Sequence, residues 1–328
     1  MRNRIAGITL CAGFAAVLSS PLPPASAAET VLRAITYAPP NKMEDSMEVF
    51  RLWMSRVNAA GKGELRVDHI GGPEVFPVPD QVNAVSKGLA DIVMTFTVHA
   101  ALVPEIDTTG LSDITMEEER RIGYMELLDK AHEKINIKVI GRTSTNSGFY
   151  IFSKEPIRKL SDFKGIKIRS HSGYDPLFKA VGAVPVGMQI SEIYSGLEHG
   201  VVRAAPYPLF VHDMGLAEVT KYVLADAFWS SHTTLTFMNR KKFDSLPPKL
   251  QQLLMNSQLQ VEKEIPRIVG DLKTKEQAKL EKAGMTFTHL SPEEARQWKR
   301  LANDSRFNAL APKITPETMA TIKKMIVR

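Results

Sequence analysis

The sequence predicts an α/β fold divided into two lobes, and two observations lead to this fold class. Candidate strands alternate with candidate helices along the chain, as expected for a sheet with helices packed on its faces. The alternation starts again near Gly148, which indicates a second sheet. Later strands return to the first sheet, so the chain crosses between the lobes at least twice. We therefore expect discontinuous domains joined by a hinge.

The first half of the chain shows the strand and helix periods directly. Apolar and polar residues alternate over Thr30–Ile35 and Glu64–Ile70, and a helical pattern lies between them over Met43–Asn58. This is a β-helix-β unit. The same lobe is predicted to continue with a helix over Gln81–Lys87, a strand over Ala90–Thr95, a long helix over Met116–Ile135 and a strand over Ile137–Arg142.

The second half repeats the alternation and ends in helices. The expected order is a strand over Gly148–Phe152, a short helix over Leu160–Lys164, a strand over Gly165–Arg169, a helix over Tyr174–Val181, a strand over Val184–Met188, a helix over Ser191–His199, and strands over Val202–Tyr207, Tyr222–Leu224 and Thr233–Met238. Lys, Glu, Gln and Leu at helical spacing over Pro247–Ala283 predict one long helix or a pair kinked at Pro266. A strand over Thr286–Leu290 precedes a capping box over Ser291–Glu294.

The N-terminal residues are typical of a secretory signal peptide. Arg2 and Arg4 form a basic start, an apolar stretch runs from Ile5 to Leu18, and Ala25 and Ala27 offer the small residues that signal peptidase prefers. The apolar stretch is shorter than the roughly 20 residues that span a bilayer. We expect cleavage after Ala27, export to the periplasm, and a mature chain that is not embedded in the membrane.

Cysteine use and charge exclude several classes of function. Cys11 is the only cysteine and lies inside the apolar stretch, so the mature chain has no thiol for disulfides, zinc–thiolate sites or cysteine nucleophiles. The full chain carries a formal net charge of +6 over segments of mixed sign, without a basic run. This balance gives little support for nucleic-acid binding and mildly favours anionic small ligands.

The sequence motifs of common catalytic sites are missing. The chain has no HExxH pair, GxSxG elbow, phosphate-binding loop or GxGxxG fingerprint. His69, His132, His199 and His212 are isolated in the sequence and are more simply interpreted as packed or surface side chains than as metal ligands. We expect no enzyme activity, no catalytic residues, no cofactor and no metal site, while metal assistance in ligand binding stays open.

Arg169 is the first candidate for ligand binding. It ends the predicted strand over Gly165–Arg169, where an α/β sheet offers its carboxyl edge to a ligand. An arginine at that edge can hold a carboxylate through two parallel hydrogen bonds, which lysine cannot do. Most arginines are solvated, so position alone favours a surface arginine.

The sequence around Arg169 favours a ligand-binding arginine over a surface arginine. The segments Glu155–Arg169, Phe178–Pro185 and Ser191–Val202 occur in order, with Gly88–Ile92 and Val103–Glu105 upstream and Lys242–Pro247 downstream. This series covers essentially the whole mature chain. It resembles the extracytoplasmic solute-binding subunits of tripartite ATP-independent periplasmic (TRAP) transporters.

The resemblance implies a two-lobed periplasmic binding protein fold with a hinge and a long C-terminal helix spanning both lobes. It places residues 28–148 and about 236–285 in lobe I, and residues 149–235 and about 286–328 in lobe II. It also implies that the protein delivers a small organic acid to TRAP membrane permease subunits. Arg169 matches the arginine that grips the ligand carboxylate in the family.

Two departures from the family pattern bear on the ligand. Tyr207 stands where an asparagine that contacts the carboxylate is usual, and its hydroxyl can still donate a hydrogen bond. Phe149 stands where sugar-acid-binding members carry a second arginine, so a sialic-acid type of specificity is disfavoured.

Other positions fall in cleft loops by the same matching. They are Tyr37, Glu74, Phe76, Thr95, Phe96, Thr97 and the segment Trp229–His232. Aromatic residues recur among them, which favours a monocarboxylate with an apolar or aromatic body. The alternative ligands are a C4-dicarboxylate, a 2-oxo acid or a sugar acid. The alternative functions are a ligand-sensing protein for a signalling partner and a secreted enzyme on a similar scaffold.

Overall fold

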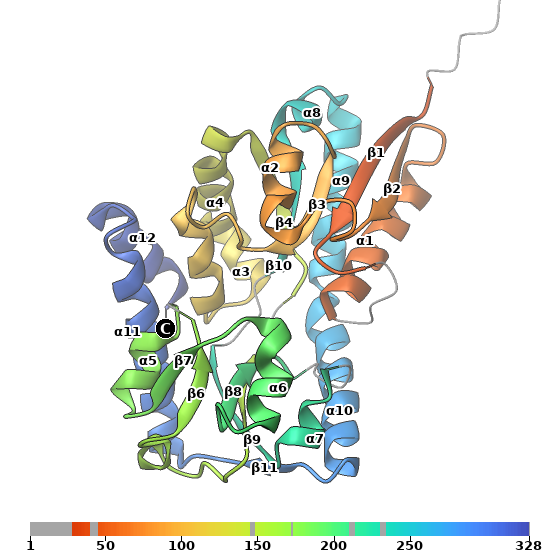
Figure 1. Cartoon of the computed structure of the whole chain (residues 1–328). Helices are drawn as coiled ribbons and strands as arrows, with labels where there is room; N and C mark the ends of the chain where they lie inside the picture. Colours follow the sequence, from red (N-terminus) through yellow and green to blue (C-terminus); the bar gives the residue numbers. More distant parts are fainter. Residues whose placement is uncertain are drawn as a thin grey trace, which may run out of the picture.

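The chain folds into two β-sheets surrounded by helices (Figure 1). The computed structural model describes residues 28–39, 45–144, 148–171, 173–209, 214–229 and 234–327. The predicted signal peptide therefore lies outside the described residues. The predicted α/β fold is confirmed.

The first sheet has five strands in the order β2-β1-β3-β10-β4. They are β2 (Leu65–Gly71), β1 (Thr30–Thr36), β3 (Ile92–Phe96), β10 (Thr234–Asn239) and β4 (Ile137–Arg142). β1 runs parallel to β2 and β3, and β10 runs antiparallel to β3 and β4. The carboxyl ends of β1, β3 and β4 therefore lie at the same edge as the amino end of β10.

The second sheet has six strands in the order β11-β9-β5-β8-β6-β7. They are β11 (Thr286–Thr288), β9 (Tyr222–Trp229), β5 (Phe149–Ser153), β8 (Ala204–Tyr207), β6 (Lys167–Ser170) and β7 (Val184–Gly187). β5 runs antiparallel to β8 and β9, and β6 runs parallel to β7 and β8. The carboxyl ends of β6, β8 and β9 therefore share an edge with the amino end of β5.

These two edges face each other because the chain crosses between them twice. Residues 143–148 join the carboxyl end of β4 to the amino end of β5, and residues 230–233 join the carboxyl end of β9 to the amino end of β10. Such short links hold both pairs of strand ends close together. We call the five-stranded sheet and its helices the first lobe, and the six-stranded sheet and its helices the second lobe.

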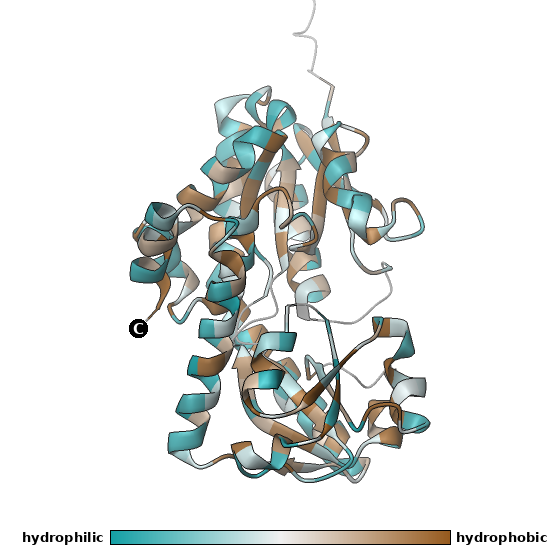
Figure 2. Cartoon of the chain, turned by 60° about the vertical axis from the view of Figure 1, so that its left-hand side comes forward, coloured by the Kyte–Doolittle hydropathy of each residue, from teal (hydrophilic) through white to brown (hydrophobic). Residues whose placement is uncertain are grey.

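Helices cover both sheets and connect the lobes. The first lobe carries α1 (Asp45–Ala60), α2 (Gln81–Ser86), α3 (Met116–Arg121), α4 (Tyr124–His132) and α8 (Arg240–Asp244), and the second carries α5 (Asp175–Ala180), α6 (Ile193–Glu198) and α7 (Leu216–Val219). Short 3-10 helices lie at η1 (Val78–Asp80), η2 (Pro104–Leu111), η3 (Glu133–Ile135), η4 (Leu160–Phe163) and η5 (Ile190–Glu192). Figure 2 shows largely hydrophobic strands inside helices that carry both hydrophobic and hydrophilic residues.

The predicted long C-terminal helix is a kinked pair that runs along both lobes (Figure 1). α9 (Pro248–Glu262) packs against α1, and α10 (Ile265–Lys282) follows after a two-residue break with Pro266 in its first turn. Proline fits there because the first turn of a helix needs no N–H from it. Leu280 near the end of α10 is buried with Phe152 of the second lobe. The prediction of a kinked pair is confirmed.

Two further helices complete the connection. α11 (Pro292–Leu310) begins at the predicted capping box, where the Ser291 side chain accepts the N–H of Glu294. Trp298 of α11 is fully buried and donates its Nε1 hydrogen to the Asp226 carbonyl of the second lobe at 3.1 Å. α12 (Pro316–Ile326) packs instead against α4 of the first lobe. The C-terminal residues therefore contact both lobes.

The prediction of one long helix over Met116–Ile135 is wrong. The structure has α3, α4 and η3 there, separated by Gly123 at φ 81°. A residue in this left-handed conformation cannot continue a right-handed helix, and glycine adopts it without a Cβ clash. The periodic spacing of apolar residues continues across the break, which is why periodicity alone misses it.

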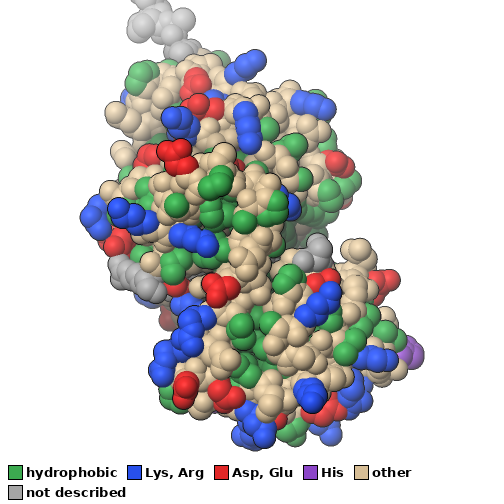
Figure 3. Space-filling view, turned by 90° about the vertical axis from the view of Figure 1, so that its left-hand side faces the viewer, with side chains coloured by type: hydrophobic (Ala, Val, Ile, Leu, Met, Phe, Trp, Pro, Cys, Tyr) green, Lys and Arg blue, Asp and Glu red, His purple; other side chains and the backbone are tan. Residues whose placement is uncertain are grey.

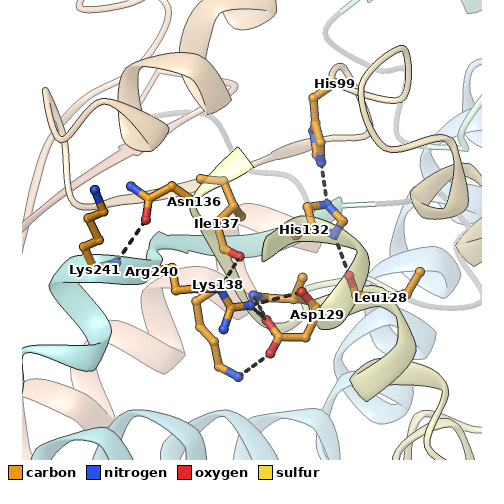
Figure 4. Close-up of polar contacts among 10 residues, drawn as sticks. His99, Leu128, Asp129, His132, Asn136, Ile137, Lys138, Arg240 and Lys241 are labelled. Atoms are coloured by element: carbon orange, nitrogen blue, oxygen red, sulfur yellow. Dashed lines mark hydrogen bonds and ion pairs between the residues drawn. The ribbon is translucent and has the colours of Figure 1, made fainter. Parts of the chain in front are cut away.

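Asp129 is a partly buried acid of the first lobe that is paired with basic side chains (Figure 4). Asp129 of α4 accepts hydrogen bonds from Lys138 Nζ and Arg240 Nη2, both at 2.6 Å, and from the Val139 N–H at 2.9 Å. These bonds tie α4 to β4 and α8. A buried carboxylate needs such partners because its charge has lost solvation by water.

Candidate functional site

Four of the predicted ligand-binding residues lie together at the second-lobe edge. Arg169 is the third residue of β6, Tyr207 ends β8, Phe149 begins β5 and Trp229 ends β9. Phe149 is directly opposite Trp229 in the β5–β9 register. Strand direction places all four at the edge that faces the first lobe.

Arg169 is a buried cation at this edge. Its side chain is 6% exposed, and its Nε donates to the Met188 carbonyl at 3.0 Å. Among the residues that the structure describes, no carboxylate forms an ion pair with it. Burial lowers the pKa of the guanidinium, and Tyr174 and Tyr207 partly oppose this shift. Arginine remains charged at neutral pH, so this positive charge has no acidic partner in the described part of the chain.

An aromatic cluster lies beside Arg169. The Trp229 ring centroid is 5.0 Å from Tyr174, 5.2 Å from Phe228 and 6.0 Å from Phe149. These are separations at which aromatic rings pack favourably. Trp229 is 9% exposed, and its buried Nε1 hydrogen has no acceptor among the residues that the structure describes. An indole N–H in this state is a donor available to a ligand.

The first-lobe edge contributes polar and aromatic side chains. Tyr37 follows β1 and packs on Phe96, which ends β3, with ring centroids 4.2 Å apart. Thr95 is fully buried, and its hydroxyl has no hydrogen-bond partner in the described segments. The Tyr37 N–H donates to the Met94 carbonyl at 3.0 Å, which fixes the loop after β1.

Glu74 and Phe76 lie in the loop before α2, and the structure gives both local contacts. The Glu74 carboxylate accepts the N–H of Gly72 at 2.6 Å, and this bond lowers the pKa of its carboxyl. Phe76 is partly buried against the main hydrophobic cluster. These contacts are typical of side chains that hold a loop, and the predicted ligand contacts of both residues stay predictions.

Sequence reasoning missed an ion pair between distant segments at this site. Arg306 of α11 pairs with Asp107 of η2 at 2.7 Å, and the Thr97 hydroxyl donates to the same carboxylate at 2.6 Å. The Arg306 guanidinium also lies over the Trp229 ring, 5.1 Å from its centroid. No local motif marks this pair, because its members are far apart in sequence.

His171 was also missed, although it follows β6 by one residue. Its ring centroid lies 3.8 Å from that of Tyr174. Burial lowers the pKa of His171 to about 4, with Arg169 and Arg306 adding to the shift. His171 is therefore neutral at pH 7 and adds no charge to the site. Burial also raises the pKa of Tyr174 to about 12, so its hydroxyl keeps its proton.

The one close histidine pair lies away from this edge, within the described part of the first lobe. His99, from the turn after β3, and His132 of α4 point toward each other with their Nε2 atoms 2.7 Å apart (Figure 4). His132 Nδ1 donates to the Leu128 carbonyl at 2.7 Å, so its Nε2 accepts from His99. Burial lowers the pKa of His99 to about 3 and that of His132 to about 4. Both rings are neutral and structural at pH 7.

The described residues show no group of three or more His, Cys, Asp or Glu side chains placed to hold a metal ion. Within the same residues, every helix is too short or too polar to cross a bilayer. Figure 3 shows two masses joined at a narrower waist, with basic and acidic side chains intermingled over this face.

The fold and this edge-to-edge site define a two-lobed α/β solute-binding protein. The sequence model of bacterial extracellular solute-binding proteins, family 7, matches residues 44–306. The chain therefore belongs to that family, and the predicted resemblance to TRAP solute-binding subunits is confirmed. The family consists of transporter solute receptors.

Relatives and solved structures agree with this assignment. The chain is 28% identical over 227 residues to the C4-dicarboxylate-binding periplasmic protein of Rhodobacter capsulatus, covering 66% of this chain and 64% of that protein. It is 34% identical over 108 residues to the 2,3-diketo-L-gulonate-binding periplasmic protein of Escherichia coli, about a third of each chain.

A TRAP periplasmic solute-binding protein from Ochrobactrum anthropi has a similar fold, with a TM-score of 0.79 at 18% identity, covering 91% of this chain and 95% of that one. A second, from Rhodoferax ferrireducens with bound malonate, has a TM-score of 0.75 at 21% identity, covering 90% and 96%.

Proposed function

We propose that this protein is the exported solute-binding subunit of a TRAP transporter, and that it captures a small monocarboxylate with an apolar or aromatic body. The observation that carries the proposal is Arg169, buried at the edge between the lobes without an acidic partner among the described residues. A buried cation without a counter-charge is costly. A ligand carboxylate would remove that cost and gain charge-assisted hydrogen bonds.

The surroundings of Arg169 favour an apolar body on the ligand. Phe149, Tyr174 and Trp229 line the same edge, and their rings are in contact with one another. Hydrophobic and aromatic walls with a few polar groups are typical of small-molecule sites. The Tyr207 hydroxyl and the Trp229 Nε1 hydrogen would then orient the acid.

The ligands named for relatives support the carboxylate class. The R. capsulatus relative binds C4-dicarboxylates, the E. coli relative binds 2,3-diketo-L-gulonate, and the R. ferrireducens structure holds malonate. All are organic acids. The second candidate ligand is a C4-dicarboxylate, which the R. capsulatus relative favours.

The proposal also includes cleavage after Ala27, residence in the periplasm and delivery to TRAP permease subunits. Residence in the periplasm is supported by the two periplasmic relatives. The sheet membership of the strands supports lobe boundaries of 28–148 with about 236–285, and 149–235 with about 286–328. The packing of α12 on α4 argues for moving that helix to the first lobe.

A thermal-shift screen of the mature protein tests the proposal. The acids are aromatic monocarboxylates, C4-dicarboxylates, 2-oxo acids and sugar acids. A ligand that binds only the folded state at about 100 times its dissociation constant stabilises it by about 2.7 kcal/mol, which is easily measured. A shift with aromatic monocarboxylates supports the full proposal. A shift with another acid class alone contradicts the aromatic preference, and no shift with any acid contradicts carboxylate capture.

A further inference from the structure

Two guanidinium groups border one aromatic cluster. Arg169 approaches from β6 and Arg306 from α11. Both positive charges act to lower the pKa values of His171 and Tyr174, and the Arg306 guanidinium lies 5.1 Å from the Trp229 ring centroid. A Cβ built on Gly173 would lie only 2.7 Å from Arg306 Nη1 and 2.8 Å from His171 Cε1. The site therefore contains two cations that could in principle meet an anionic ligand.

The two cations differ in their partners. Arg306 is held by Asp107 at 2.7 Å, with side chains 17% and 14% exposed. The Thr97 hydroxyl donates to Asp107 Oδ1 at 2.6 Å, so the carboxylate is fixed on two sides. Arg169 has only the Met188 carbonyl as a hydrogen-bond partner among the described residues. Within the described residues, the charge of Arg306 is thus neutralised by Asp107, whereas the charge of Arg169 has no acidic partner.

The neutralising carboxylate comes from the first lobe. Asp107 lies in η2 and Thr97 follows β3, whereas α11 packs against β9 and α5 of the second. A second ligand carboxylate that reached Arg306 would meet a cation whose charge Asp107 already neutralises. The negative charge of Asp107 would also repel that carboxylate, so Arg306 would add little to the binding of a dianion.

We propose that Asp107 makes the site selective for monoanions, by neutralising Arg306 so that only Arg169 is left to pair with a ligand carboxylate. This inference rests on the proposed capture of a carboxylate between the lobes. It assigns specificity to a residue that contacts the second arginine and not Arg169. It also predicts how the selectivity can be changed.

The test compares matched acids that differ by one carboxylate. Benzoate is compared with phthalate, and butanoate with succinate, by calorimetry at about pH 8, where every carboxylate is ionised. The mature wild-type protein is expected to prefer the monoacid of at least one pair by about tenfold or more. Asp107→Asn keeps an acceptor for Thr97 and removes the charge. It is expected to reduce that preference at least about tenfold or to reverse it.

Two further variants make the result specific. Arg306→Met leaves Asp107 as an unpaired negative charge and is expected to weaken the dianion more than the monoanion, because repulsion grows with ligand charge. If Asp107→Asn does not fold, Arg306→Met alone tests the inference. Asp107→Asn combined with Arg306→Met is expected to restore the monoacid preference. An unchanged mono-to-dianion ratio in Asp107→Asn, or an equal loss of both acids in Arg306→Met, overturns the inference.

The two levels of the proposal fail in different ways. If the wild-type protein binds none of these acids nor any acid of the thermal-shift screen, carboxylate capture itself is wrong. If the wild type binds an acid and Arg169→Met abolishes binding, capture stands. An unchanged ratio in Asp107→Asn then removes only the role of Asp107.

Discussion

Arg169 donates its Nε hydrogen to the Met188 carbonyl at 3.0 Å, across the neighbouring ends of β6 and β7. This bond uses one of the five guanidinium N–H donors and restricts the side chain. The two Nη groups make no hydrogen bond within the described residues. They can donate two parallel hydrogen bonds to the two oxygens of one carboxylate. The bond thus preorganises Arg169 for a ligand.

Tyr207 provides a test of the hydroxyl that replaces the usual asparagine. Tyr207→Phe removes one donor and keeps the ring, so acid binding should weaken by about 0.5–1.5 kcal/mol. Calorimetry with the acid identified in the screen measures the loss. Tyr222→Phe is the control, because Tyr222 begins β9 at the opposite end of the second sheet. Equal affinities for Tyr207→Phe and the wild type would show that the hydroxyl does not contact the acid.

The ion pair of Arg142 with Glu119 should be important for stability. The two groups are 2.6 Å apart, and their side chains are 2% and 0% exposed. Arg142→Met leaves a buried carboxylate unpaired and should cost about 3–5 kcal/mol of unfolding free energy. Urea unfolding measures this loss. Arg142→Met combined with Glu119→Leu should cost clearly less than Arg142→Met alone. A double variant that is as unstable as Arg142→Met, or less stable, would contradict this explanation.

The buried histidines should make the protein less stable in acid. The pKa values of His99 and His132, about 3 and about 4, lie below the 6.5 of an exposed histidine. Between pH 6.5 and these lower values, the unfolded chain therefore binds more protons than the folded chain. The contribution of the two histidines to the free energy of unfolding is fully present above pH 6.5 and falls as the pH drops toward 4. His69 and His171 shift in the same direction.

Thermal unfolding between about pH 8 and pH 5 measures this dependence. His132→Phe removes one of the titrating groups, and its unfolding midpoint should fall less steeply with acidification than that of the wild type. Parallel slopes for the two proteins would show that His132 is not protonated differently in the folded and unfolded states.

Alanine variants of two glycines distinguish the effect of backbone strain on stability from that of helix propensity. Gly123 has φ 81° and Gly270 lies within α10, and a Cβ built on either would contact nothing within 4 Å. Gly123→Ala should destabilise the protein by about 1 kcal/mol because the left-handed conformation is unfavourable for alanine. Gly270→Ala should stabilise it by about 0.5–1 kcal/mol. Unfolding free energies of the two variants with the same sign would contradict this distinction.

The elements with clear periodicity were predictable from the sequence. Alternation over Thr30–Ile35 predicts β1, and Pro266 within a helical pattern predicts the kink between α9 and α10. The break at Gly123 was not predictable, since a glycine inside a helical pattern is usually tolerated. Strand length also depends on neighbours: β9 extends five residues past the predicted Leu224, where it pairs with β5 and packs against α11.

The candidate site was predictable mainly through the resemblance to a known family. Arg169 ends the predicted strand over Gly165–Arg169, but position alone favoured a surface arginine, and the ordered series of family motifs singled it out. Asp107 and Arg306 are neighbours only after the lobes are assembled, so no local pattern could indicate their ion pair. His99 and His132 were missed as a pair for the same reason, because each looks isolated along the chain.

The most direct test of the account compares ligand binding by the wild type, Arg169→Met and Arg169→Lys, using the acid that gives the largest thermal shift. We expect Arg169→Met to lose about 2–5 kcal/mol of binding free energy. Its unfolding midpoint without ligand should stay the same or rise, because a buried charge is removed. Arg169→Lys should recover only part of the loss, since lysine cannot form the bidentate pair. Binding by Arg169→Met within about tenfold of the wild type would contradict the central role of Arg169.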